Sequence, residues 1–158
     1  MAKKTQTEEK LELLGKKIVK DIEKKQNPAI DIPVRSISNV NFDKKTKILK
    51  MGDKMAKRFF FNVAHAKKFL QTIEVASISK TLLGMDKHAS LRDVFYMAKR
   101  TIPGTKINLV DEQEETDGVI EDLELVTDCS REQLNVNANK NGSVAGKVII
   151  EDKGDVID

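Results

Sequence analysis

The stretch Ser90-Leu-Arg-Asp-Val-Phe-Tyr-Met-Ala-Lys-Arg100 contains the only tyrosine of the chain and sets it among cations. Its apolar residues recur at steps of three and four, which predicts a helix with one buried face. Ser90 is a suitable N-cap, and Asp93 completes a shortened capping box. Because Arg92 and Tyr96 are four residues apart, we expect them to share the opposite flank of this helix. The apolar face comprises Leu91, Val94, Phe95 and Ala98.

A longer helix is predicted just before this one. From about Lys54 to Leu83, apolar residues follow a 3.6-residue stripe, and Gly84 closes the segment. The pattern allows one continuous helix or two helices broken near residues 76–79. A short turn over residues 85–89 then leads to the tyrosine helix. Helix, tight turn and second helix with a cap serine give the outline of a helix-turn-helix.

An acidic segment follows Pro103, which cannot continue the tyrosine helix. Residues 111–124 hold eight carboxylates and no lysine or arginine. The second part of the segment has helical spacing and predicts a third helix running towards Leu134. The first part offers carboxylates for a divalent metal, but it lacks the alternating acidic residues and central glycine of a calcium loop. We therefore expect no metal site at Asp111, Glu112, Glu114 and Glu115.

Residues 135–150 are predicted to form a β-hairpin, with Asn139-Lys-Asn-Gly-Ser143 as the turn. A hairpin directly after a three-helix unit corresponds to the wing of a winged helix.

The N-terminal part predicts one helix and one hairpin. Apolar residues at three- and four-residue steps predict a helix from Glu9 to Gln26, which Asn27-Pro28 ends. Its narrow apolar stripe fits either the chain's own domain, which we favour, or a partner subunit. Residues 33–42 and 47–51 predict two strands around the polar turn Asp43–Thr46.

Charge is divided unevenly along the chain. Residues 1–106 carry 24 Lys and Arg against 11 Asp and Glu, whereas residues 107–158 carry 4 against 14. A basic part of this size fits nucleic acid binding, although a lysine-rich solvated surface explains it equally well. Six Phe, one Tyr and no Trp argue against a platform of base-stacking aromatics.

Composition also limits the possible cellular locations and the possible kinds of catalytic site. No apolar run approaches the roughly 20 residues of a membrane span, and no secretory signal is visible. The single cysteine, Cys129, fits a reducing compartment, so we expect a cytoplasmic protein with no membrane partner. Two histidines and one cysteine supply no Ser-His-Asp or Cys-His arrangement, and His65 is expected to be structural.

Five blocks of the sequence occur in a distinctive order and at distinctive separations. The blocks are Asn27-Pro-Ala-Ile-Asp-Ile-Pro-Val-Arg-Ser36, Lys57-Arg-Phe-Phe-Phe-Asn-Val-Ala-His-Ala66, Ser90-Leu-Arg-Asp-Val-Phe-Tyr96, Asp111-Glu-Gln-Glu-Glu-Thr-Asp117 with Ile120-Glu-Asp-Leu-Glu124, and Ile150-Glu-Asp-Lys-Gly-Asp-Val-Ile-Asp158. Together they resemble the N-terminal part of the A subunit of the type IIB DNA topoisomerases (topoisomerase VI), which are related to the transesterase that makes meiotic double-strand breaks.

The resemblance implies an α+β fold: a winged-helix domain with a catabolite-activator-like helix-turn-helix, an N-terminal helix and flanking β-hairpins. It places the N-terminal extension at residues 1–27, the winged-helix DNA-cleavage domain at 28–150, and a linker towards an absent Toprim domain at 151–158. In the family motif an Arg-Asp pair precedes two aromatic residues, and the second aromatic is the nucleophile. These positions fall on Arg92 and Tyr96.

The resemblance further implies ATP-dependent cleavage of both DNA strands, with Tyr96 linked to a 5′ end while another duplex passes and supercoils relax. The expected partners are double-stranded DNA, the B subunit of topoisomerase VI, a second A subunit in an A2B2 heterotetramer, and a Toprim-bearing polypeptide. Mg2+ is expected from the Toprim domain and ATP on the B subunit, with no metal ligand in this chain. A nucleoid-associated location follows from these expectations.

Two functions remain compatible with these residues. In the first, Tyr96 attacks the phosphodiester with help from Arg92, since a free phenol has a pKa of about 10 and is a weak nucleophile. In the second, the chain is a split or reduced relative that binds DNA or a partner protein without cutting. If the chain binds DNA, the expected contacts are Lys99, Arg100, His88 and the wing lysine Lys140, although a solvated turn explains Lys140 equally well.

Overall fold

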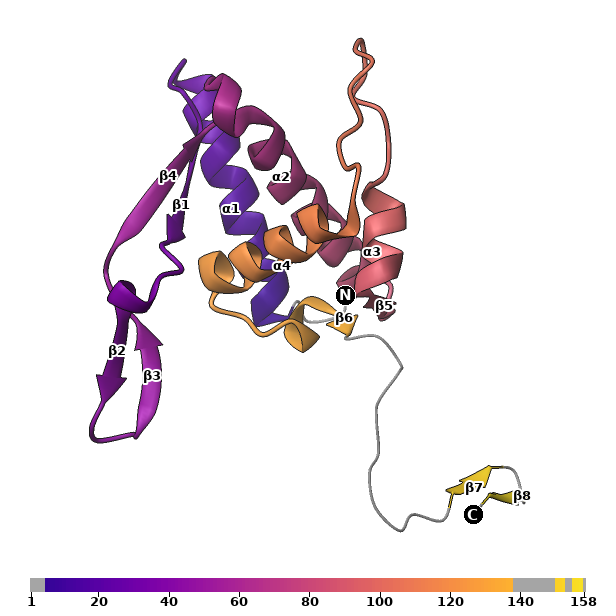
Figure 1. The fold of residues 1–158 in the computed structure, drawn as a ribbon. Coiled ribbons are helices and arrows are strands. Elements are labelled where there is room, and N and C mark those ends of the chain that lie inside the picture. The colour runs from indigo at the N-terminus through magenta and orange to yellow at the C-terminus, as the bar shows by residue number, and fades with distance from the viewer. Residues whose placement is uncertain (1–4, 138–149, 153–154, 158) are drawn as a thin grey trace.

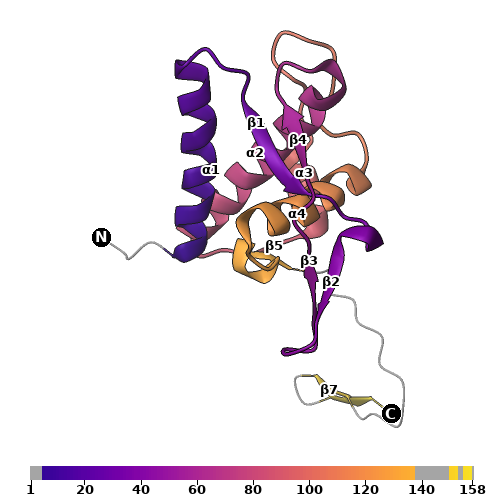
Figure 2. The same ribbon diagram turned by 90° about the vertical axis from the view of Figure 1, so that its left-hand side faces the viewer.

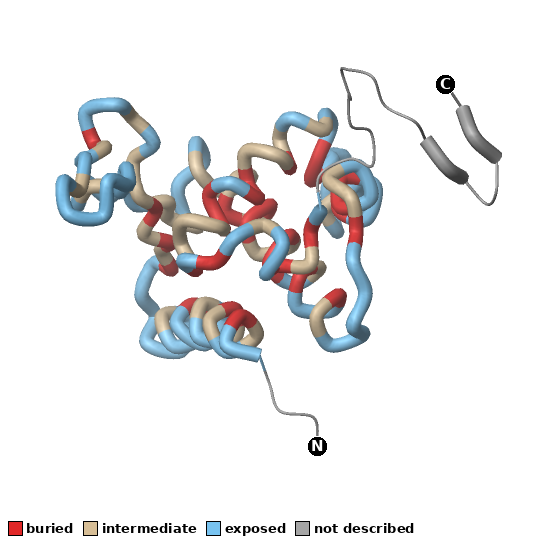
Figure 3. Tube along the Cα trace, turned by 90° about the horizontal axis from the view of Figure 1, so that it is seen from below, coloured by how far each residue is buried: buried red, intermediate tan, exposed pale blue. Residues whose placement is uncertain are grey.

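Three helices form the centre of the computed structural model, which describes residues 5–137, 150–152 and 155–157. They are α2 (Val63–Gly84), α3 (Leu91–Ala98) and α4 (Gln113–Thr127) (Figure 1). Figure 3 shows that buried residues gather where the helices meet. No helix in the described part of the chain is long and apolar enough to cross a bilayer. The core they enclose includes Val75, Val94, Val119, Ile120 and Leu123.

Helix α3 begins as the sequence predicts. The Ser90 hydroxyl accepts a hydrogen bond from the Asp93 backbone N–H at 3.1 Å, and the Asp93 carboxylate accepts one from the Ser90 N–H at 2.9 Å. These two bonds close a capping box and fix the first turn. Val94, Phe95 and Ala98 are buried, so the predicted inner face is confirmed.

Helix α2 starts later than its periodicity predicts. It begins at Val63, after the Asn62 side chain accepts a hydrogen bond from the Ala64 N–H at 3.0 Å, and it runs unbroken to Gly84. The prediction of helix over residues 54–59 is wrong. Strand β4 (Met55–Phe59) lies there and pairs antiparallel with β1 (Ala29–Pro33), a distant partner that supplies backbone hydrogen bonds no local pattern reveals.

The N-terminal helix α1 (Gln6–Glu23) begins three residues before the predicted start, because Thr5 and Glu8 form a second capping box. Leu11 packs into the core cluster around α2 and α4, and Ile18 packs beside strand β1. The expectation that this helix docks on its own domain is confirmed.

The predicted hairpin is present as β2 (Val40–Asp43) and β3 (Ile48–Met51), paired antiparallel. It does not extend back to residue 33, because a 3-10 helix (Ile37–Asn39) intervenes. The buried Asn39 side chain fixes this bend by donating to the carbonyl oxygens of Val34 and Lys54. Figure 2 shows the hairpin projecting from the body of the molecule.

The third predicted helix is confirmed as α4, but it ends at Thr127 instead of near Leu134. Asp128 adopts a left-handed conformation with φ 49°, which stops the helix, and a 3-10 helix (Glu132–Leu134) follows. Strand β6 (Val136–Asn137) then pairs in parallel with β5 (Ala89–Ser90), immediately before α3.

Residues 138–149, including Lys140 and the turn of the predicted wing, lie outside the described residues. Beyond them, β7 (Ile150–Asp152) and β8 (Asp155–Ile157) pair antiparallel. The α+β class is thus confirmed, whereas the winged-helix assignment stays a prediction.

Candidate active site

Arg92 and Tyr96 meet on the solvent side of α3. The guanidinium Nε and Nη2 of Arg92 lie 3.3 and 3.2 Å from the Tyr96 hydroxyl oxygen and donate to it. Tyr96 is 55% exposed, and its ring lies 5.2 Å from that of the buried Phe95. The capped helix and its buried inner face therefore present a phenol and a guanidinium together to solvent.

The hydrogen bonding of this pair places a permanent positive charge beside the phenol oxygen. Arginine has only donors, so the Tyr96 oxygen accepts from Arg92 and leaves the phenolic proton free to point elsewhere. The hydrogen bond to Tyr96 raises the pKa of Arg92 above its ordinary value. A guanidinium so placed stabilises a phenolate and, because of its forked donors, also binds a phosphate.

The other predicted DNA contacts have different surroundings. The Lys99 ammonium lies 5.1 Å from the centroid of the Phe95 ring, on the exposed side of the helix end. Arg100 is ion-paired with Glu74 of α2, so its charge is already partly compensated. His88 is exposed in the turn before α3. Their DNA contacts stay predictions, as does that of Lys140.

The acidic segment does not gather its carboxylates into a metal site. The Lys67 ammonium of α2 lies 2.8 Å from Asp111 and 3.0 Å from Glu115, so a cation of the protein itself stands between them. The Lys67 hydrogen bond lowers the pKa of Asp111 below its ordinary value. Within residues 5–137 and the two short strands beyond them, no group of three His, Cys, Asp or Glu side chains is close enough to hold a metal ion.

The sequence does not predict an ion cluster that joins three segments around a buried carboxylate. Asp122 of α4 is 1% exposed, and its carboxylate lies 2.6 Å from Arg58 of β4 and 3.1 Å from Arg35. Arg35 also pairs with Glu121. Burial near this cluster lowers the pKa of Lys68. One feature of the sequence could have predicted this cluster. Asp122 lies between the core residues Ile120 and Leu123, and a carboxylate buried there needs a cationic partner.

His65 and Cys129 have structural surroundings. The His65 Nδ1 accepts a long hydrogen bond from the Phe59 N–H at 3.5 Å, which links α2 to β4. Cys129 is buried and lies 3.8 Å from the Thr7 hydroxyl. Neither side chain lies in α3, and the link from His65 to β4 fits the structural role expected for it.

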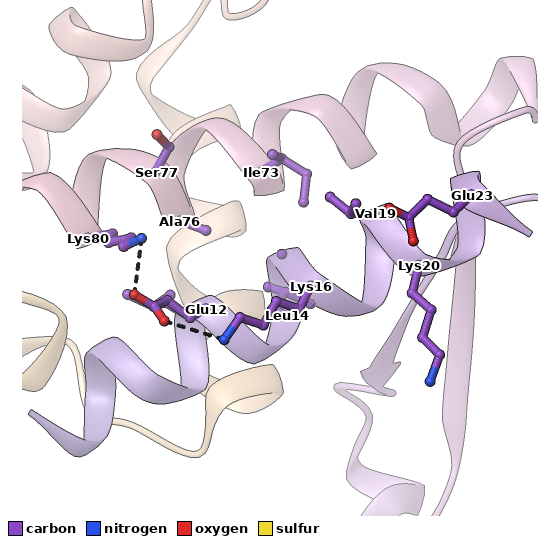
Figure 4. A pocket seen from close by; sticks show the side chains of 12 residues that line it. Glu12, Leu14, Lys16, Val19, Lys20, Glu23, Ile73, Ala76, Ser77 and Lys80 are labelled. Atoms are coloured by element: carbon purple, nitrogen blue, oxygen red, sulfur yellow. Dashed lines mark ion pairs between the residues drawn. The ribbon is translucent and has the colours of Figure 1, made fainter. Parts of the chain in front are cut away.

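A groove of about 830 Å³ runs between α1 and α2 (Figure 4). Its floor is apolar, and at its rim Glu12 pairs with Lys16 at 3.7 Å and with Lys80 at 3.3 Å. The groove contains no residue of α3, so it is separate from the Arg92–Tyr96 pair.

Comparison with known proteins gives one consistent family. The sequence profile of the family described as type IIB DNA topoisomerase matches residues 67–136, which contain α3 and α4. The A subunit of type 2 DNA topoisomerase 6 from Pyrococcus abyssi is 42% identical over 146 residues, covering 92% of this chain and 38% of that protein. The protein of the same name from Saccharolobus shibatae is 36% identical over 150 residues, covering 89% and 39%.

A more distant relative, the A subunit of type 2 DNA topoisomerase 6 from Methanocaldococcus jannaschii, is 34% identical over 131 residues, covering 82% of this chain and 34% of that protein. The chain spans less than two-fifths of the length of these three relatives. It belongs to the type IIB DNA topoisomerase family and corresponds to a fragment of the topoisomerase VI A subunit.

Proposed function

We propose that this chain is the DNA-binding and DNA-cleaving part of an ATP-dependent type IIB topoisomerase, with Tyr96 as nucleophile. The observation that carries the proposal is the hydrogen-bonded Arg92–Tyr96 pair on the exposed flank of α3, within the segment that matches the family profile. A phenol that attacks DNA needs access to it and a nearby cation, and the exposure of Tyr96 and its contact with Arg92 support the proposal on both counts.

The proposed step is a transesterification. The Tyr96 oxygen attacks a phosphodiester, its proton passes to solvent, and the bond from phosphorus to the 3′ oxygen breaks. The released 3′ oxygen takes up a proton, while the 5′ phosphate stays linked to the tyrosine. Arg92 stabilises the phenolate before attack and neutralises the phosphate during it. Reversal reseals the strand, because the phosphotyrosyl link conserves the energy of the broken bond.

The chain would act within a larger assembly. The described carboxylates do not fit a magnesium site, since Lys67 lies between Asp111 and Glu115. We therefore assign Mg2+ to a Toprim domain, which the described residues do not include, and ATP to the B subunit. A second A subunit would supply the tyrosine for the other strand in an A2B2 heterotetramer on nucleoid DNA. The names of the relatives, each an A subunit, support a multisubunit enzyme.

The test is a trapping assay. The full chain is mixed with the B subunit, a Toprim-bearing polypeptide, Mg2+, ATP and supercoiled plasmid, and covalent adducts are trapped with denaturant. We expect a 5′-linked adduct with the wild-type chain and with the exposed neighbour variant Met97→Leu, but only background with Tyr96→Phe. Equal amounts of adduct from wild type and from Tyr96→Phe would show that Tyr96 is not the nucleophile. Duplex binding with no adduct from any variant would favour a non-catalytic winged-helix module.

A further inference from the structure

Residues 40–51 form a projecting two-stranded ribbon, which we call the basic ribbon, made of β2, β3 and the turn between them. Figures 1 and 2 show it extending from the body of the molecule, and in Figure 1 it lies at the opposite side from α3. It lies outside the segment that matches the family profile. The proposed role of the Arg92–Tyr96 pair therefore assigns no function to the ribbon.

The turn of the ribbon carries uncompensated positive charge. Its one carboxylate, Asp43, accepts hydrogen bonds from the backbone N–H of Lys45 at 2.9 Å and of Thr46 at 3.3 Å, and pairs with Lys50 at 2.8 Å. These contacts, led by Lys50, lower the pKa of Asp43 to about 2. Asp43 is therefore ionised and already neutralised. Within the described residues, no carboxylate pairs with Lys44, Lys45 or Lys47.

One face of the ribbon is apolar. Because Phe42 pairs with Leu49 in the antiparallel register, their side chains lie on the same face. They are 58% and 68% exposed. The next pair on that face, Val40 and Met51, lines a cavity at the base of the ribbon together with Leu125 of α4. The outer pair is therefore left open to solvent beside the three unpaired lysines.

We propose that the basic ribbon is a second DNA-binding element, in which Lys44, Lys45 and Lys47 contact phosphates of a duplex and the Phe42–Leu49 pair lies against the groove. This inference rests on the proposed function, because it takes duplex DNA as the substrate. A two-stranded ribbon fits the major groove, which is about 12 Å wide. In minor-groove binders, too, apolar side chains such as Phe and Leu contact the bases while basic side chains lie beside them.

A protein surface is the less favoured occupant. Protein–protein interfaces are depleted in lysine, and their cores contain more apolar area than one exposed pair supplies. Phosphates, in contrast, complement three neighbouring ammonium groups directly. Since the ribbon and α3 lie on opposite sides of the molecule in Figure 1, the ribbon would hold DNA away from the bond that Tyr96 attacks.

The test measures duplex affinity of the full chain against salt concentration, by fluorescence anisotropy. The tip variant carries Lys44→Gln, Lys45→Gln and Lys47→Gln. A matched control carries Lys20→Gln, Lys24→Gln and Lys25→Gln, which removes three exposed charges near the end of α1. Each lost phosphate contact lowers the slope of log K against log salt by about 0.9. We expect the tip variant to lose about 2 to 3 units of slope and roughly tenfold or more of affinity at 0.1 M salt.

A Phe42→Ala variant refines the test, because it should weaken binding without changing the slope. Circular dichroism and thermal melts establish that each variant is folded. Equal slopes for the tip variant, the control and wild type would overturn the ribbon proposal, as would wild-type DNA binding combined with a tip-dependent loss of protein self-association. Tyr96→Phe removes no charge, so failure of the trapping assay alone leaves this slope measurement unaffected and the two proposals separable.

Discussion

Two arginine sites in this chain differ in the burial of the group that the arginine contacts, and this difference separates a site suited to binding from one that stabilises the fold. On α3, Arg92 faces solvent and donates to the Tyr96 hydroxyl, an uncharged partner that it can exchange for a phosphate. Around Asp122, Arg58 and Arg35 hold a carboxylate that is 1% exposed. An exposed guanidinium keeps most of its hydration and can change partners at low cost. The buried Asp122 carboxylate has lost that hydration and depends on its arginine partners. We therefore expect mutations in the two sites to affect different measurements.

The largest effect on stability should come from Asp122→Asn. Loss of this carboxylate leaves the partly buried Arg58 without its counter-charge, whereas the exposed Arg35 keeps Glu121. We expect a loss of about 3 kcal/mol of unfolding free energy, the size seen when one partner of a buried ion pair is removed. The matched control is Asp128→Asn at the exposed end of the same helix, for which we expect less than about 0.5 kcal/mol. Urea unfolding followed by circular dichroism gives both values. Equal losses for the two variants would mean that the cluster contributes no special stability.

A smaller loss is expected when the start of α3 is weakened. Ser90→Ala removes the side-chain acceptor of the capping box and should lower the unfolding free energy by about 1 kcal/mol. Ser90→Thr keeps the hydroxyl and should retain most of that stability. The same urea titration tests both variants. No difference between them would indicate that burial of the inner face alone fixes the helix start.

Arg92→Ala should barely change stability, because an exposed hydrogen bond to a neutral phenol contributes little. We expect an unfolding free energy within about 0.5 kcal/mol of wild type, together with strong loss of the trapped DNA adduct. Arg92→Lys keeps the charge without the forked donors and should recover only part of the adduct. A destabilised Arg92→Ala protein would show that this arginine also maintains the fold.

The smallest expected effect is local and concerns the turn of the basic ribbon. Lys50→Gln should raise the pKa of Asp43 from about 2 towards its ordinary value, because Lys50 is the main cause of the shift. The contribution of this carboxylate to stability is present above its unfolded pKa and is lost as pH falls through the lowered folded value. Carbon NMR titration of Asp43 measures the change, with Lys54→Gln as control. An unchanged pKa would assign the shift to the backbone N–H groups.

Features that depend on near neighbours could be predicted from the sequence. The Ser90–Asp93 box, the apolar face of α3 and the meeting of Arg92 with Tyr96 all involve residues three or four apart, whose geometry a helix fixes. The β2–β3 hairpin was predictable for the same reason, since a short turn sets its register. The ordered blocks of residues also predicted the family, because several matches at consistent separations are specific.

The pairing of distant residues, in contrast, emerged only in the folded molecule. Residues 55–59 carry spacing compatible with helix, yet pairing with β1 makes them a strand. Arg100, which follows α3, pairs with Glu74 of α2, and Asp122 pairs with Arg58 and Arg35 from a distant part of the sequence. Such choices depend on the summed packing of several elements and on the cost of burying a charge. Neither quantity is encoded in a local pattern.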